Sequence, residues 1–150
     1  YWPQLFLGIT FNYGLILGWT AVKGQVDLVI VVFYIGAIFW TLGYDTIYGF
    51  QDIKDDEIIG LKSTSIKFKN KPYLLLLSCY SIFSFSLLIS GYLMKFNKIS
   101  LLIFITLLIQ MFYFQLKKLD IDNPSSCLKT FKSNNYLGLI VFFGLLLGRF

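Results

Sequence analysis

The chain alternates long apolar runs with short polar segments. A helix needs about 20 apolar residues to cross the hydrocarbon core of a bilayer, and on that scale the hydropathy pattern predicts five spans. They are expected near residues 4–22, 26–46, 72–94, 99–118 and 134–149. Charged residues cluster between these runs, whereas an amphipathic soluble helix would carry them on one face throughout. The pattern therefore predicts an all-α integral membrane protein, with one membrane domain over residues 1–150.

Composition supports a membrane protein and narrows its chemistry. Hydrophobic residues make up 57% of the chain and aromatic residues 19%, more than globular proteins contain. The net charge is +5, but no basic stripe is interleaved with exposed aromatic residues, so a nucleic-acid partner is not expected. Because there is no histidine, any bound metal would be held by oxygen and would be a hard cation such as Mg²⁺. Cys79 and Cys127 lack the spacing of a zinc site or disulfide framework and are expected to be incidental thiols.

Five spans place alternate connections on opposite sides of the membrane. The side reached after the second and fourth spans carries nine lysines: Lys54, Lys62, Lys67, Lys69, Lys71, Lys117, Lys118, Lys129 and Lys132. The other side carries four basic residues: Lys23, Lys95, Lys98 and Arg149. The positive-inside rule therefore predicts that the connection after the second span faces the cytoplasm, although lysines near span ends also snorkel to the headgroups.

The stretch GYDTIYGFQDIKDDEIIGLKST, residues 43–64, contains five of the eight acidic residues. If it were one helix, Asp45, Asp52 and Asp56 would lie within about 20° of one face, with Asp55 and Glu57 about 80° and 120° away from it. Like charges one turn apart repel, and an aspartate inside a span is costly. A divalent cation would offset both the repulsion and the cost of placing an aspartate in the span. Mg²⁺ is usually held by one or two carboxylates, water and substrate phosphates.

The alternative is that the acidic residues form a charged cytoplasmic loop that ends a span, with Lys54 and Lys62 neutralising them. Helical spacing alone leaves both interpretations open.

The same stretch resembles the second aspartate-rich motif of the UbiA superfamily of intramembrane prenyltransferases. The motif elements are Tyr44-Asp45, Tyr48, Asp52 with Asp56, Ile59-Gly60 and Lys62-Ser63-Thr64. The opening residues YWPQLFLG are similar to the stretch that precedes this motif in the 4-hydroxybenzoate polyprenyltransferase branch. The resemblance by motif covers residues 1 to about 70, and the remainder agrees in hydropathy and span count.

This resemblance implies transfer of a polyprenyl group from polyprenyl diphosphate to the 3-position of 4-hydroxybenzoate in ubiquinone biosynthesis. It implies a bacterial or mitochondrial inner membrane, with the acidic segment facing the cytoplasm or matrix. Transfer to a naphthoate, haem or glycerol phosphate acceptor, and a non-catalytic five-span protein, remain as alternatives.

Site roles follow from the resemblance residue by residue. Asp52 and Asp56 are expected to hold Mg²⁺ and the diphosphate, and Asp45 to orient the cation or the aromatic substrate. Tyr44 and Tyr48 are expected to line the carbocation cavity, or else to belong to the aromatic belt at the membrane interface. Lys62 is expected to contact the diphosphate, or else to snorkel.

The chain departs from the family in one respect. The family has nine spans and a first motif of NDxxDxxxD type in its N-terminal half, whereas Asn12 here is followed by Tyr13 and no aspartate precedes Asp27. The chain is therefore expected to correspond to the C-terminal half of such a bundle. It is further expected to be inactive without an N-terminal half that carries the first motif.

Overall fold

The computed structural model describes residues 1–148, which form helices and their connections without any strand. The helices are α1 (Pro3–Phe11), α2 (Tyr13–Lys23), α3 (Leu28–Gly49), α4 (Ile53–Ile58), α5 (Thr64–Lys67), α6 (Pro72–Leu93), α7 (Lys98–Ile109), the π-helix η1 (Gln110–Lys117) and α8 (Pro124–Leu147).

Five helical segments in the described residues are long and apolar enough to cross a membrane, which confirms the predicted all-α membrane fold. They are Pro3–Lys23, Leu28–Gly49, Pro72–Leu93, Lys98–Lys117 and Pro124–Leu147. The first combines α1 with α2, and the fourth combines α7 with η1. Their length and hydropathy identify an integral membrane protein.

The fifth span begins earlier than the predicted residue 134. α8 starts at Pro124, because the Asn123 side chain accepts hydrogen bonds from the backbone N–H groups of Ser125 and Ser126 and caps the helix. Proline suits this first position because its missing N–H would be unpaired there. Hydropathy did not reveal these turns because they are polar, and hydropathy reports burial in lipid and not helix formation. The predicted end at residue 149, and Arg149 of the charge count, lie outside the described residues.

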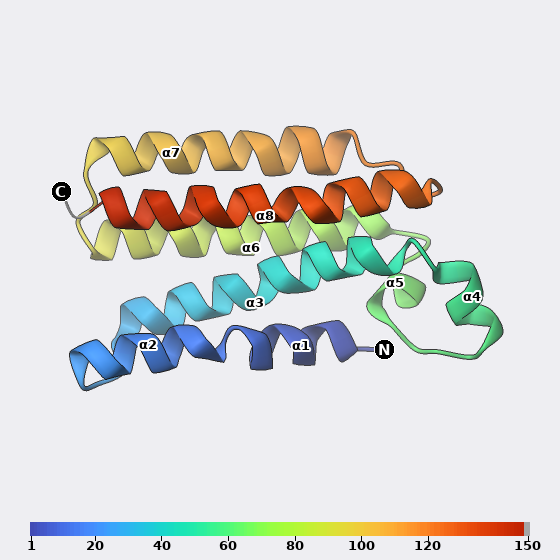
Figure 1. Ribbon diagram of the computed structural model, residues 1–150, viewed down its shortest axis with the longest axis horizontal. Helices are drawn as coiled ribbons and strands as arrows, with labels where there is room; N and C mark the ends of the chain where they lie inside the picture. Colours follow the sequence, from blue (N-terminus) through green and yellow to red (C-terminus); the bar gives the residue numbers. More distant parts are fainter. Residues whose placement is uncertain (149–150) are drawn as a thin grey trace.

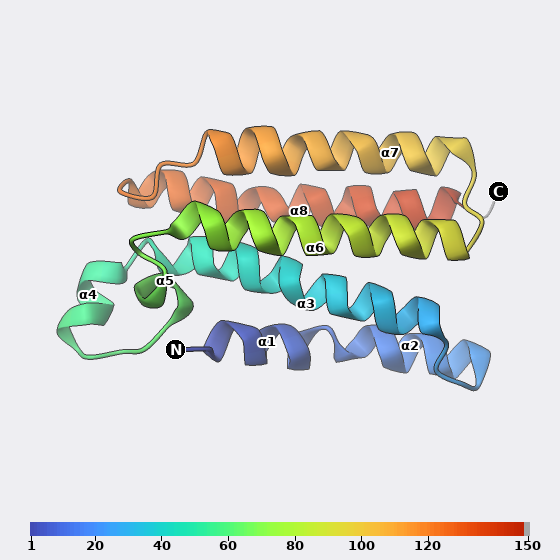
Figure 2. The same ribbon diagram turned by 180° about the vertical axis from the view of Figure 1, so that it is seen from behind.

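The spans run up and down side by side in a bundle (Figure 1). The connection from α3 to α6, which contains α4 and α5, lies at the same end as the connection from η1 to α8 (Figures 1 and 2). The lysine-rich connections therefore share one end of the bundle, as span counting predicted. The start of α1 also lies at this end.

The central packing is between α3 and α6. Gly36 lies so close to Ser86 that a methyl group at Gly36 would overlap the serine side chain, and the Ser86 hydroxyl donates to the Val32 carbonyl. Small residues allow helix backbones to approach in this way within a membrane. Of the 18 residues that make each span apolar enough to cross a membrane, 50% are buried in α6 but only 6% in the span formed by α1 and α2. α6 is therefore the central helix, and the first span lies at the edge of the bundle.

The first span is interrupted at Asn12, which separates α1 from α2. Its side-chain amide donates to the Gly8 carbonyl at 2.8 Å, to the Thr41 hydroxyl at 2.8 Å and to the Ala37 carbonyl at 3.3 Å. The last two contacts are on α3, so a polar residue within the apolar span is paired, and it ties the helix break to the neighbouring span.

A second polar bridge crosses the bundle between α6, η1 and α8. The buried Gln115 accepts a hydrogen bond from the Tyr80 hydroxyl at 2.7 Å and donates to the Ser133 hydroxyl at 2.8 Å. The bridge leaves the side chain of Gln115 paired at both ends inside an apolar interior, which a buried amide requires.

Candidate functional site

The acidic stretch does not form one helix. α3 ends at Gly49, and α4 begins at Ile53 after a short non-helical link. Asp45 therefore belongs to the second span, while Asp52 and Asp56 belong to the connection beyond it. The prediction that these three carboxylates project from one continuous helical face is wrong.

A local feature and a tertiary contact together account for the break after Gly49. Glycine is a weak helix former, and a methyl group at Gly49 would overlap the Ser65 side chain. The absence of a side chain at Gly49 thus lets α5 pack against the end of α3. Sequence spacing contains no information about this crossing, which depends on residues sixteen positions later.

Asp52 and Asp56 remain close to each other across the first turn of α4. Asp52 is the residue before the helix, and its carbonyl accepts a hydrogen bond from the Asp56 backbone N–H at 2.9 Å. Asp52 is exposed and Asp56 half-buried. Carboxylates at a helix N-terminus also interact favourably with the helix dipole.

This pair fits a hard divalent cation by its donor chemistry. Within residues 1–148, no group of three or more histidine, cysteine or acidic side chains is gathered at a single point. Two carboxylates one turn apart therefore offer part of a coordination shell. Mg²⁺ is commonly bound in this manner, with water and substrate phosphates completing the octahedron.

Tyr44 and Tyr48 belong to an aromatic cluster on the face of α3 that meets α8. The Phe131 ring centroid lies 4.7 Å from that of Tyr48 and 5.8 Å from that of Tyr44. Trp40 continues the cluster, with its centroid 5.9 Å from Tyr44 and 4.9 Å from the stacked ring of Phe83. The cluster, defined as Trp40, Tyr44, Tyr48, Phe83 and Phe131, lies next to Asp45 along α3.

Trp40 is held in place by a partner that the sequence analysis did not identify. Its indole N–H donates to the Asn134 side-chain oxygen at 3.0 Å, and Asn134 is buried in α8. The signal for Trp40 was present, because Trp40, Tyr44 and Tyr48 recur every four residues and so share one helical face. Nothing in the sequence indicated Asn134 or Phe131, which come from a distant span.

The Ile59-Gly60 element ends α4. Gly60 has φ of +74°, a left-handed conformation that glycine adopts without steric cost. The Leu61 N–H donates to the Asp56 carbonyl at 2.9 Å and the Gly60 N–H to the Glu57 carbonyl at 3.2 Å. This is the Schellman arrangement that closes a helix C-terminus, so the motif glycine here has a structural role.

The Lys62-Ser63-Thr64 element combines an exposed cation with buried hydroxyls. The Lys62 side chain points away from the core, with its amino group 5.8 Å from the Tyr1 ring centroid. Ser63 caps α5 by accepting from the Ile66 N–H at 3.3 Å. Lys62 is thus free to reach a ligand at the surface, while Ser63 and Thr64, which follow it, are buried and stabilise the fold.

Thr64 and Ser65 fasten the connection to the bundle. The Thr64 hydroxyl lies 2.7 Å from that of Thr46, and the Ser65 hydroxyl donates to the Thr46 carbonyl at 2.9 Å. The Thr64 backbone N–H donates to the Gln4 side-chain oxygen at 3.1 Å. Four buried residues form a polar anchor that joins α1, α3 and α5: Gln4, Thr46, Thr64 and Ser65. The sequence analysis did not identify the anchor as such.

The neutralising contacts expected of Lys54 and Lys62 are not formed. Across the described chain, the ion pair that the structure shows joins Lys69 to Glu57 at the exposed surface. Asp52 and Asp56 are therefore left without a lysine partner among residues 1–148. Within the described residues the two cysteines are free thiols, and both are buried, Cys127 in the first turn of α8.

The chain is similar to known proteins over nearly its whole length. Residues 1–146 match the model of the UbiA prenyltransferase family. The mitochondrial 4-hydroxybenzoate polyprenyltransferases of Bos taurus and Homo sapiens are each 44% identical to the chain over 99% of its length. The 4-hydroxybenzoate geranyltransferase 1 of Lithospermum erythrorhizon is 37% identical over the same share. The chain spans 40% of the two mammalian proteins and 48% of the plant protein. No solved structure gives a significant match.

Proposed function

This chain belongs to the UbiA prenyltransferase family, and we propose that it serves in the transfer of a polyprenyl group from polyprenyl diphosphate to the 3-position of 4-hydroxybenzoate, the reaction that prepares the ring for ubiquinone. The observation that carries the proposal is the Asp52 and Asp56 pair, which lies one turn apart in the connection that follows α3 at the end of a membrane bundle.

Asp52 and Asp56 would hold Mg²⁺ at the lysine-rich end of the bundle. Bound there, the ion would supply charge stabilisation to the departing diphosphate oxygens. The two carboxylates lie outside the apolar part of α3, where a diphosphate can remain hydrated while its prenyl chain extends into the bilayer. Lys62, exposed on the same connection, would add a cationic contact to the diphosphate.

The aromatic cluster would act on the carbon end of the substrate. When the allylic C–O bond breaks, a carbocation forms, and the π faces of Tyr44 and Tyr48 can stabilise it. Asp45, half-buried on α3 next to Tyr44, would orient the aromatic acceptor. The ring then forms a C–C bond to the cation at its 3-position and loses a proton. The surrounding apolar helices exclude water, which would otherwise capture the cation.

The mammalian and plant relatives differ in their named prenyl group but share 4-hydroxybenzoate in their names. This favours 4-hydroxybenzoate over a naphthoate, haem or glycerol phosphate acceptor.

We further propose that the chain supplies one of two metal-binding motifs and needs a second set of spans carrying the first motif. The inner membrane of bacteria or mitochondria is the proposed location, with the Asp-rich connection facing the cytoplasm or matrix. This orientation places the connection where water-soluble 4-hydroxybenzoate and Mg²⁺ are accessible.

The test is transfer of labelled 4-hydroxybenzoate to a polyprenyl diphosphate in membranes that contain this chain together with the N-terminal half of the bovine relative. Product that requires Mg²⁺ and disappears with EDTA supports the proposal. Absence of product, with the chain folded and inserted, contradicts it.

A further inference from the structure

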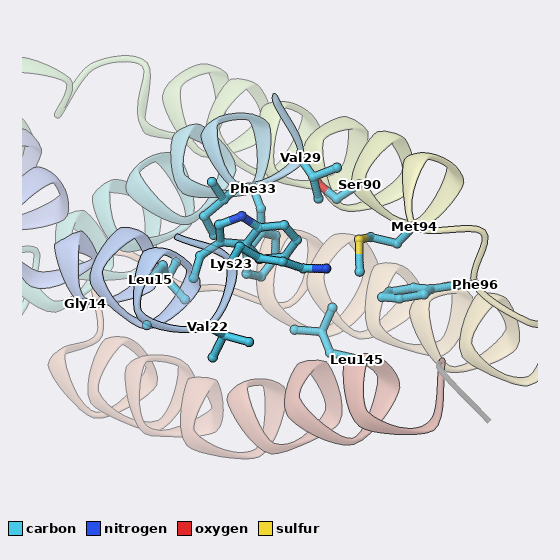
Figure 3. A pocket seen from close by; sticks show the side chains of 13 residues that line it. Gly14, Leu15, Val22, Lys23, Val29, Phe33, Ser90, Met94, Phe96 and Leu145 are labelled. Carbon is cyan, nitrogen blue, oxygen red and sulfur yellow. The ribbon is translucent and has the colours of Figure 1, made fainter. Parts of the chain in front are cut away.

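A cavity of ≈ 420 Å³ lies between α2, α3, α6 and α8, within the size range of ligand pockets. It lies toward the end of the bundle away from α4 and α5, since its lining residues come from α2, the start of α3, the end of α6 and the end of α8 (Figures 1 and 3). Its wall is mainly apolar, with Phe33, Met94 and Leu145 among its members. The Asp-rich site described above does not use this cavity.

Ser90 is an unpaired polar group in this apolar wall. Its side chain is 3% exposed, and its hydroxyl finds no hydrogen-bond partner within the described chain. Ser84 and Ser86 of the same helix instead donate to the carbonyls of Tyr80 and Val32. Leaving a buried hydroxyl without a partner is unfavourable, so Ser90 indicates a ligand with a hydrogen-bond acceptor.

Lys23 supplies the second polar contact. It is the last residue of α2, and in Figure 3 its side chain lies across the cavity with the amino end toward Met94. Its amino group lies 5.9 Å from the Trp19 ring centroid and makes no ion pair within residues 1–148. The nearby Asp27 is already engaged, because it accepts hydrogen bonds from Trp19 at 3.3 Å and Gln25 at 2.8 Å. Lys23 therefore presents a positive charge that an anion can complement.

The cavity is open at its α2 edge. Gly14 and Gly18 form its edge on α2, and a methyl group at either position would meet no atom within 4 Å. Val22, on the next turn, is 82% exposed. Because α2 is part of a membrane span, these exposed positions lie in apolar surroundings and not in water.

From these observations we infer that the cavity binds an anionic phospholipid. The lipid phosphate pairs with Lys23 at the membrane surface, and one ester carbonyl accepts a hydrogen bond from the Ser90 hydroxyl. One acyl chain fills the apolar space beside Gly14 and Gly18. An isoprenoid alcohol could accept a hydrogen bond from Ser90, but it carries no charge to pair with Lys23. Basic pockets between membrane helices recognise anionic headgroups in this way on the cytoplasmic or matrix side, and we infer the same pairing at the opposite end of this bundle. The inference is independent of the proposed transferase activity.

The test uses Trp19, which lines the cavity, as a reporter. The full chain is placed in phosphatidylcholine vesicles that contain a minor fraction of brominated phosphatidylglycerol or, separately, of brominated phosphatidylcholine. The quenching that disappears in Trp19→Phe is assigned to the cavity. We expect the anionic lipid to quench this fraction roughly fivefold more effectively, the size expected for one basic residue near an anionic lipid surface.

Variants assign the preference to the named contacts. Lys23→Gln should abolish the preference and Lys23→Arg should retain it, while Lys98→Gln at the same end of the bundle should have no effect because Lys98 does not line the cavity. Ser90→Ala should weaken quenching by both lipids, since both carry ester carbonyls. Equal quenching of the unmodified chain by the two lipids would overturn the inference, whatever the variants do. Displacement of the brominated lipid by undecaprenol at equal concentration would also overturn it, and would assign the cavity to an isoprenoid chain.

Discussion

The hydroxyl oxygens of Thr46 in α3 and Thr64 in α5 lie 2.7 Å apart inside the protein, although eighteen positions separate them. Thr46 also donates to the Leu42 carbonyl at 2.6 Å, so Thr64 donates to Thr46 in the shared contact. This bond closes the connection that carries Asp52 and Asp56 back onto the second span. The position of the Asp-rich segment relative to the aromatic cluster therefore depends on a contact between two neutral hydroxyls.

Replacing Thr64 by valine should loosen this connection. The change preserves shape but removes the hydroxyl from a fully buried position, so the chain should lose about 1–2 kcal/mol of stability. Thermal unfolding in detergent should show a lower Tm, and proteolysis within residues 50–71 should accelerate. Thr10→Val is the matched control, because Thr10 is exposed and bonds only within its own helix. Equal proteolysis rates for the two variants would refute the anchoring role.

Gly60→Ala should destabilise the end of α4. A non-glycine residue at φ of +74° costs about 1–2 kcal/mol, and the Schellman contacts of Leu61 and Gly60 would be strained. Gly14→Ala serves as the control, since that helical position has open space and no positive φ, and alanine is the better helix former by about 1 kcal/mol. The two substitutions should therefore shift Tm in opposite directions. A shift of the same sign would show that the backbone at Gly60 is not constrained.

In membranes that also contain the N-terminal half of the bovine relative, Asp52→Asn and Asp56→Asn should each reduce Mg²⁺-dependent transfer by at least about 10²-fold, because each removes a charged ligand that stabilises the departing diphosphate. Raising the Mg²⁺ concentration should restore part of the activity if the lost function is metal binding. Asp55→Asn is the internal control, being exposed on the same short helix. It should stay within a few-fold of the unmodified chain, and an equal loss in all three variants would point to general charge and not to a metal pair.

The chain by itself should form no prenylated product, because one pair of carboxylates supplies only part of the charge that the diphosphate requires. Radiolabelled 4-hydroxybenzoate, with Mg²⁺ and with EDTA, provides the measurement. Activity should appear when spans that carry the first Asp-rich motif are co-expressed. Mg²⁺-dependent product from this chain alone would mean that one motif suffices or that two copies share a site.

The lysine-rich end of the bundle should face the cytoplasm or matrix. Lys118→Cys and Lys98→Cys place exposed thiols at opposite ends, while the natural cysteines are buried. A membrane-impermeant maleimide added to intact cells should label the cysteine at position 98 and reach that at position 118 only after the membrane is opened. The reverse pattern would place Asp52 and Asp56 on the outer side.

Much of the architecture was determined by the sequence alone. Apolar runs long enough to cross a bilayer predict the spans directly, because the solvent around each span is lipid and the requirement is local. The aspartate motif was equally visible, since its chemistry depends on residue types at short spacing, and Asp52 and Asp56 do lie one turn apart.

The tertiary structure decided what local patterns do not contain. Asp45 is separated from Asp52 because α5 packs against Gly49 and α3 ends there. Thr64 and Asn134 are ordinary polar residues in the sequence. They stabilise the fold because α3 places Thr46 and Trp40 within hydrogen-bond distance of them. In an apolar interior each buried polar group must find its partner wherever the fold supplies one. For Thr64 and Asn134 that partner lies on α3. Packing of the bundle, and not helical periodicity, therefore brought these residues together.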